Sequence, residues 1–129
     1  MIDHLGLRIS DYNRSKAFYE KVLSPLGFEV LKEITPEMTG GESHCGFGQK
    51  NGHTIPFWIG TSQPLSGQVH VAFSAKSRAA VDAFYHAALA AGAKDNGPPG
   101  PRPIYHPGYY GAFVLDPDGN NIEAVCHQL

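Results

Sequence analysis

The chain has 129 residues, 42% of them hydrophobic and 17% charged, and this length suits one domain (residues 1–129) with a core of its own. A formal net charge of −2 without a run of Lys or Arg argues against nucleic acid and anionic membranes as partners. The start of the chain does not read as a signal peptide, and no apolar run reaches membrane-spanning length. Cys45 and Cys126 lack CxxC spacing and are expected to be small buried thiols. We therefore expect a soluble cytoplasmic protein.

The sequence contains an internal repeat. A shift of 66 positions lays residues 4–7 on residues 70–73 and residues 17–19 on residues 83–85. Two copies are too few for a solenoid. They indicate a pseudo-symmetric pair of modules that bury their apolar faces together.

The first copy is predicted to follow the order strand, helix and then three strands. Leu5, Leu7 and Ile9 alternate with His4, Gly6 and Arg8, which is the period of a strand. Asp11 is placed to cap a helix that runs through about Leu23. The apolar face of that helix consists of Phe18, Tyr19, Val22 and Leu23. Further strands are predicted at residues 28–31, 45–49 and 54–59.

The second copy repeats this order. Val69, Val71 and Phe73 alternate in the same way, and Ser77 caps a helix that ends just before Gly92. The face of this helix predicted to point inward consists of Val81, Phe84, Tyr85, Ala88 and Leu89. Strands are predicted near residues 93–95 and at residues 112–115 and 121–126.

These elements predict an α+β fold. Module one is expected over residues 1–62 and module two over residues 68–129, with a break near residues 63–67. The two βαβββ modules are expected to form a cupped, barrel-like mixed sheet in a pseudo-two-fold arrangement, with the helices outside.

Strand alternation also predicts a metal site. If the stripe that begins at Leu5 faces the helix, His4 points to the opposite face, and His70 has the repeat-equivalent position. Glu123 alternates with apolar residues in the last strand and should project to the same face. Two histidines and one carboxylate are typical of non-haem iron sites, so Fe2+ is favoured, with Zn2+, Ni2+, Mn2+ or Co2+ as alternatives. The competing interpretation is that both histidines are hydrogen-bonded strand residues in a polar groove.

Residues 96–111 form a segment rich in proline and glycine that carries Tyr105, His106, Tyr109 and Tyr110. A connection of this length in a small domain is usually functional or disordered, and the aromatic residues argue against simple disorder. We predict a rigid lid whose tyrosines contact substrate. The alternative is that the tyrosines pack on the rim of the sheet or against a partner subunit.

Three more residues are predicted to line the cup. Trp58 and Phe113 would give it apolar walls, and Arg8 is a candidate partner for an acidic group of the substrate. The alternative for Arg8 is a solvated charge at a strand end. His127 lies on the same face of its strand as Glu123 and is a spare ligand candidate.

The chain resembles the vicinal oxygen chelate superfamily, which includes glyoxalase I, extradiol dioxygenases and the bleomycin and fosfomycin resistance proteins. The resemblance rests on residues 2–7 and 15–19 at the start of the chain and on residues 113–123 (FVLDPDGNNIE) near its end. It covers nearly the whole chain and is specific to the superfamily rather than to one reaction. Members commonly dimerise, so the resemblance implies a homodimer, with the pocket either within one chain or shared between two.

In this family the metal ligands come from the first and fourth strands of each module, which implies His4, His70 and Glu123 here. The remaining position falls at Pro56, with Trp58 as its neighbour on that face, and neither side chain binds a metal. This departs from the pattern of glyoxalase I, for which the resemblance implies four metal ligands.

A set of two histidines and one glutamate is similar to that of the extradiol dioxygenases. Their signature implies His106 as an acid or base beside a metal-bound oxygen. Phe113 replaces the tyrosine of that signature, and the chain is half the size that such enzymes usually have.

Three functions follow from these observations. The first is a metal-dependent enzyme on a small oxygen-chelating substrate, such as an aromatic one, with dioxygenase-like chemistry ahead of lyase or isomerase chemistry. The second is a metal-free protein that sequesters a small molecule, as bleomycin resistance proteins do. The third is a non-catalytic interaction module. We favour the enzyme, because a sequestering cup does not need the two histidines and the glutamate together.

Overall fold

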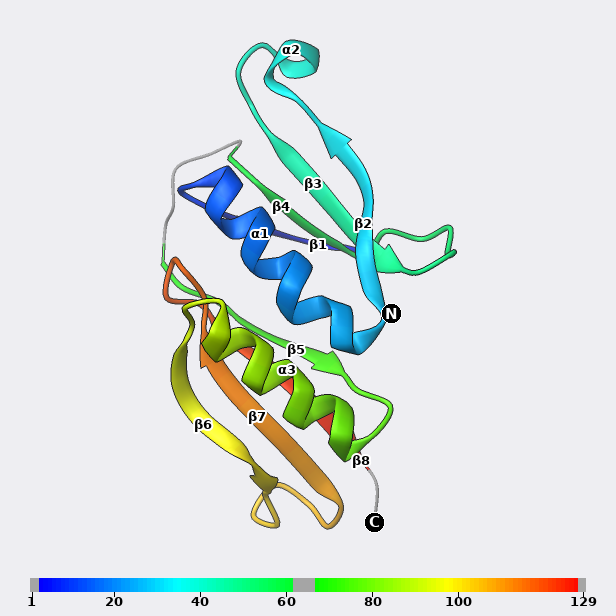
Figure 1. Cartoon of the computed structure of the whole chain (residues 1–129), viewed down its shortest axis with the longest axis vertical. Coiled ribbons are helices and arrows are strands. Elements are labelled where there is room, and N and C mark those ends of the chain that lie inside the picture. The colour runs from blue at the N-terminus through cyan, green and yellow to red at the C-terminus, as the bar shows by residue number, and fades with distance from the viewer. Residues whose placement is uncertain (1–2, 62–66, 128–129) are drawn as a thin grey trace.

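The computed structural model describes residues 3–61 and 67–127, and in it the chain forms two four-stranded mixed sheets (Figure 1). One long helix crosses each sheet, and the order βαβββ occurs twice. The predicted α+β fold of two βαβββ modules is therefore confirmed. Within the described residues the two sheets stay separate and do not close into a barrel. The break predicted at residues 63–67 lies mostly outside the described residues.

The two modules have the same topology. The elements of the first are β1 (Leu5–Arg8), α1 (Tyr12–Leu23), the 3-10 helix η1 (Ser24–Leu26), β2 (Phe28–Ile34), α2 (Pro36–Thr39), β3 (His44–Gln49) and β4 (Phe57–Gly60). Those of the second are β5 (His70–Ser74), α3 (Arg78–Ala90), β6 (Lys94–Pro101), β7 (Tyr109–Leu115) and β8 (Asn121–His127). The strand orders are β1-β4-β3-β2 and β5-β8-β7-β6, and in both sheets the first strand runs parallel to its neighbour.

Both long helices begin where the sequence predicts. The Asp11 side chain accepts a hydrogen bond from the Arg14 amide at 3.1 Å, and the Ser77 hydroxyl accepts one from the Ala80 amide at 3.1 Å. Each bond satisfies an amide that lacks a partner within the first turn of its helix. The apolar faces are also as predicted, except that Leu89 is 38% exposed. Leu89 lies at the edge of the stripe formed by positions 81, 84, 85 and 88, where the sheet no longer covers it.

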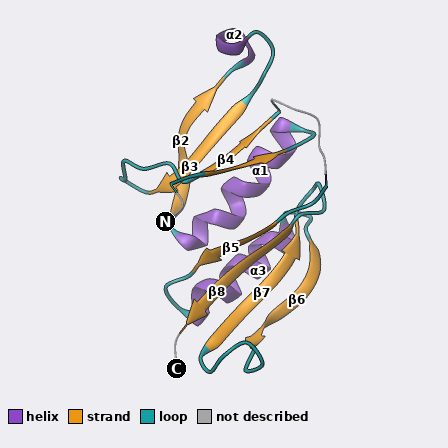
Figure 2. Ribbon diagram, turned by 180° about the vertical axis from the view of Figure 1, so that it is seen from behind, coloured by secondary structure: helices purple, strands orange, loops and turns teal. Residues whose placement is uncertain are grey.

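The two modules share one core. Helices α1 and α3 lie side by side and in contact, on the same side of the molecule (Figures 1 and 2). The buried Tyr19 hydroxyl donates to the Asp116 carboxylate at 2.6 Å, and the Ser10 hydroxyl donates to Asp118 at 2.6 Å. These bonds tie α1 and its N-terminal approach to the turn between β7 and β8, which fixes the relative position of the modules.

The faces of the sheets opposite the helices are open, as the view from behind shows (Figure 2). Leu7 and Ile9 are buried on the helix side as predicted, but Leu5 is 39% exposed. Leu5 lines a groove of about 330 Å3 at the junction of the modules, together with Phe28, Phe57 and Phe73. Leu5 lies on the same face of β1 as Leu7 and beside the buried Phe57, so it faces the helix side as predicted, but the helix does not bury it.

The proline-rich segment is not a long loop. Residues Lys94–Pro101 form β6, the edge strand of the second sheet, and only residues 102–108 form a connection before β7. The β6–β7 pairing is interrupted between Asp95 and Gly97 and again between Gly97 and Gly100. Edge strands and irregular positions are where a sheet tolerates proline, which lacks the amide donor. Of the lid predicted over residues 96–111, only the short turn of residues 102–108 lies outside the strands.

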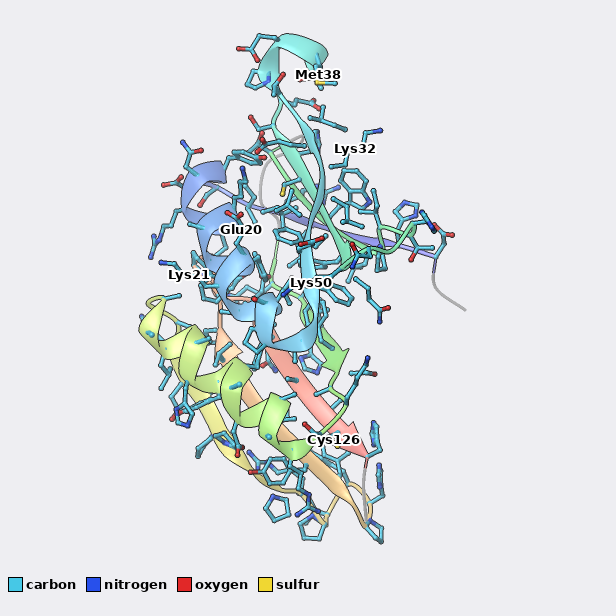
Figure 3. The ribbon with its side chains drawn as sticks, turned by 45° about the vertical axis from the view of Figure 1, so that its right-hand side comes forward. Glu20, Lys21, Lys32, Met38, Lys50 and Cys126 are labelled. Atoms are coloured by element: carbon cyan, nitrogen blue, oxygen red, sulfur yellow. The ribbon has the colours of Figure 1, made fainter. Side chains whose placement is uncertain are left out.

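Other features complete the architecture. Helix α2 was not predicted; it caps the β2–β3 connection, where Met38 is 66% exposed (Figure 3).

Cys45 and Cys126 are buried as predicted. Burial raises the pKa of the Cys45 thiol to about 11, which argues against a nucleophilic role at neutral pH. Among the described residues, no helix combines the length and the apolar character needed to cross a membrane.

Candidate metal and substrate site

Two of the three predicted metal ligands meet on the open face of the second sheet. His70 opens β5 and Glu123 lies in the middle of the adjacent parallel strand β8. The apolar neighbours of Glu123 face the helix and are buried, so alternation turns the carboxylate to the other side. The His70 Nε2 atom lies 3.2 Å from Glu123 Oε1.

The hydrogen bonding of His70 determines which of its nitrogens carries the proton. His70 Nδ1 lies 2.9 Å from the Asn121 carbonyl oxygen, which can only accept, so Nδ1 donates and carries the hydrogen. In the neutral ring, Nε2 then presents a lone pair toward the Glu123 oxygen, which is an acceptor when ionised. Two acceptors at this distance are stable together only with a proton or a cation beside them. A backbone carbonyl on the second nitrogen is also the usual arrangement of a histidine that binds metal.

The second oxygen of Glu123 is occupied by Tyr109. The Tyr109 hydroxyl donates to Glu123 Oε2, and the glutamate is only 2% exposed. Burial, together with this hydrogen bond, raises the pKa of Tyr109 to about 12. Gly111 lies below the pair, and a Cβ at that position would be 3.1 Å from Glu123 Oε2. The buried carboxylate thus has one oxygen held by a phenol and the other directed at His70.

The third predicted ligand, His4, does not join this pair within the chain. Its Nδ1 atom lies 2.7 Å from the neighbouring Asp3 carboxylate, and both side chains are exposed. Among the described residues, no three His, Cys, Asp or Glu side chains gather closely enough to hold a metal ion. His4 precedes β1 in the first sheet, whereas His70 and Glu123 belong to the second.

His106 has a partner that the sequence did not indicate. Its Nδ1 lies 2.6 Å from the Pro107 carbonyl and its Nε2 lies 2.9 Å from His127 Nδ1. Since the carbonyl only accepts, His106 Nδ1 donates to it, and Nε2 accepts from His127. Both nitrogens of His106 are engaged away from His70 and Glu123. His127, predicted as a spare ligand, instead holds the 102–108 turn against the end of β8.

The predicted substrate-binding aromatic residues of module two divide between the two faces of the sheet. The Phe113 ring stacks on His70 with 6.2 Å between centroids, and Tyr105 packs edge-on against Tyr109 at 5.0 Å. Tyr110 lies on the helix side, where its hydroxyl donates to Asp82 of α3 at 2.7 Å. Tyr110 therefore does not line the site, as alternation with its neighbour Tyr109 requires.

The open face of module one carries a second hollow, of about 200 Å3. It is lined by Arg8 and Trp58, both predicted, and by His44, which was not among the predicted site residues. Gly60 is part of its lining, and a Cβ there would lie 2.2 Å from His44 Nδ1. A Cβ at Gly46, on the adjacent strand, would touch the Trp58 indole. His44 was recognisable, because it alternates with Gly46 and Gly48 on the same strand face as Trp58.

Comparisons with known proteins agree with the fold. Residues 1–124 match the family model described as the glyoxalase/bleomycin resistance protein/dioxygenase superfamily. No curated protein sequence matched the chain. A glyoxalase/bleomycin resistance protein from Albidiferax ferrireducens T118 has a similar structure, with a TM-score of 0.70 and 26% identity over 96% of both chains.

Two other similar structures have named activities or ligands. Glyoxalase I from Zea mays has a TM-score of 0.72 and 23% identity, with 97% of this chain covering 45% of that one. The fosfomycin resistance protein FosX from Listeria monocytogenes, solved with Mn(II) and a dihydroxypropylphosphonic acid, has a TM-score of 0.68 and 20% identity over 96% of this chain and 90% of that one. At these identities the likeness concerns the fold.

Proposed function

The chain belongs to the glyoxalase/bleomycin resistance protein/dioxygenase superfamily, and we propose that within it the protein is a metal-dependent enzyme for a small substrate chelated through adjacent oxygens. The observation that carries the proposal is the approach of His70 Nε2 to within 3.2 Å of Glu123 Oε1, with His70 Nδ1 anchored on the Asn121 carbonyl. A buried carboxylate and an imidazole nitrogen, each already anchored on its far side, are a donor set suited to a divalent cation.

We propose that His70, Glu123 and His4 hold this metal, with Fe2+ favoured and Zn2+, Ni2+, Mn2+ or Co2+ as alternatives. When bound, it would supply a Lewis acid or an oxygen-activating centre with positions left open for substrate. Dioxygenase-like chemistry is favoured over lyase or isomerase chemistry, since Pro56 and Trp58 supply no fourth ligand. The Mn(II) in the similar FosX structure supports a divalent metal on this fold.

His4 would come from a second copy of the chain. In one chain it belongs to the other sheet and pairs with Asp3, so a homodimer that faces module one of one chain with module two of the other would complete the site. Isologous dimers of this kind form two equivalent sites. The proposed enzyme is therefore a homodimer with a shared pocket.

The same arrangement would bring the two open faces together around the substrate. Phe113 and Tyr105 would contact it from the module that holds the metal. Trp58 and Arg8 would close over it from the facing module, with the indole against a planar substrate and the guanidinium near an acidic group. The buried walls would exclude water from the reacting oxygens.

Elemental analysis of the purified protein tests the proposed metal site. His4→Ala, His70→Ala and Glu123→Ala each remove one ligand, so each variant should lose the metal that the wild-type protein carries. His86→Ala, which removes an exposed histidine of α3, is the matched control and should keep it. A full complement of metal in all three ligand variants would contradict the site.

A second candidate function is favoured by the module-one hollow. The hollow is lined by Trp58 together with Gly6 and Gly60, and the Trp58 side chain cannot serve as a fourth metal ligand. Such a hollow suits a protein that sequesters a flat apolar molecule without metal. Trp58 is the single tryptophan of the chain, so its fluorescence reports binding there. Quenching by a small aromatic ligand that is unchanged in Glu123→Ala would favour sequestration, whereas quenching that requires Glu123 would favour the enzyme.

A further inference from the structure

We propose that Tyr109 is a positioning residue that presents Glu123 to the metal through a single carboxylate oxygen. This inference rests on the proposed function, because it concerns the metal site formed by His70 and Glu123. It assigns Tyr109 a role other than contact with substrate.

The first step concerns the two oxygens of the Glu123 carboxylate, which have different partners. Glu123 Oε1 lies 3.2 Å from His70 Nε2, and Glu123 Oε2 accepts the hydrogen bond of the Tyr109 hydroxyl. A carboxylate whose second oxygen is held by a phenol offers one oxygen to a cation rather than two. The phenol also fixes the rotation of the carboxylate about its last torsion, which is otherwise broad.

The second step is that Tyr109 is itself held in place. Its ring packs edge-on against Tyr105 at 5.0 Å, His106 at 5.3 Å and His127 at 5.2 Å, measured between ring centroids. His106 and His127 are hydrogen-bonded to one another at 2.9 Å. The Tyr109 ring is therefore packed against three other rings, of which Tyr105 and His106 come from the 102–108 turn and His127 from the end of β8.

The third step concerns Gly111 of β7, which leaves room for the contact between the Tyr109 hydroxyl and the Glu123 carboxylate. A Cβ at Gly111 would lie 3.1 Å from Glu123 Oε2 and 3.2 Å from Tyr109 Cε1, tighter than ordinary contact with both partners. Gly111 sits between Tyr109 and Phe113 on the same face of β7. A side chain here would push the phenol and the carboxylate apart.

Co2+ binding to the purified, metal-free protein tests the inference, with affinity measured by competition with a chromophoric chelator and ligand geometry by the visible absorption of the bound ion. Tyr109→Phe keeps the ring and removes only the hydroxyl, so it should weaken Co2+ binding by about 10- to 100-fold and change the spectrum. Gly111→Ala, which keeps the hydroxyl but crowds it, should weaken binding in the same direction.

Tyr110→Phe is the matched control. It also removes a phenol that donates to a carboxylate, but on the helix side, and should leave Co2+ affinity unchanged. If Tyr109→Phe and Gly111→Ala both bind Co2+ as tightly as the wild-type protein and with the same spectrum, the inference is overturned while the metal site stands. If the wild-type protein takes up no Co2+, the proposed function is overturned and the inference with it.

Discussion

At the residue scale, alternation along two strands was sufficient to predict that His70 and Glu123 share a face, and the structure brings them within 3.2 Å. The sequence did not indicate which nitrogen of His70 faces the carboxylate, because that depends on a backbone carbonyl of the adjacent strand. Nor did it indicate the partner of Glu123. Phe113 lacks the hydroxyl of the dioxygenase signature, yet a phenol reaches the glutamate from Tyr109, two steps along the same strand face.

The structure also refines the role of His106. Its contacts are to Pro107, His127 and Tyr109, none of which is a proposed ligand. His106→Ala should therefore lower turnover while leaving metal content intact, which oxygen uptake on a panel of catechols after anaerobic Fe(II) loading would measure beside elemental analysis. His86→Ala is the control. Loss of metal equal to that of Glu123→Ala would make His106 a ligand instead.

At the scale of the element, the two long helices were predicted closely, whereas helix α2 and most of strand β6 were not. Capping side chains and an apolar stripe are local signals, so α1 and α3 begin at the predicted caps, Asp11 and Ser77. Strand β6 was predicted only at its start, near residues 93–95, because the prolines and glycines that follow indicate a loop when the chain is considered alone. Its pairing depends on β7, a neighbour that supplies hydrogen bonds at the few positions where β6 is regular.

The helix caps allow a quantitative prediction. Asp11→Ala and Ser77→Ala each remove the acceptor for one amide of the first turn, and each should lower the free energy of unfolding by about 1 kcal/mol. The two losses should add, because the caps lie in different modules. Urea denaturation followed by circular dichroism measures them. Asn13→Ala, an exposed change in the first turn of α1, is the control; a loss as large as that of the caps would contradict the capping argument.

At the scale of the whole molecule, the repeat predicted two modules in a pseudo-two-fold, cupped arrangement, but it did not indicate whether one chain or two complete the pocket. That arrangement depends on long-range contacts such as Tyr19 with Asp116, which join residues almost a hundred positions apart. It decides whether His4 can reach Glu123 in the same chain. The structure separates them into different sheets, which is why the proposed site requires a second copy.

Co-expression of two inactive variants tests the shared site. His4→Ala and Glu123→Ala homodimers should each lack metal, but a heterodimer of the two has one site with all its ligands. A random mixture should therefore recover about a quarter of the wild-type metal content. No recovery in isolated heterodimers would show that each site is built from one chain, and size-exclusion chromatography with light scattering would show whether dimers form at all.

The anchor of His70 does not depend on the identity of any side chain. The group that orients the imidazole is the main-chain carbonyl of Asn121, its direct neighbour in the parallel ladder between β5 and β8. Every amino acid supplies that carbonyl, so no mutation at position 121 can delete it while the ladder persists. Substitution of Asn121 should therefore leave the orientation of the His70 imidazole unchanged, whereas disruption of the β5–β8 ladder should release it.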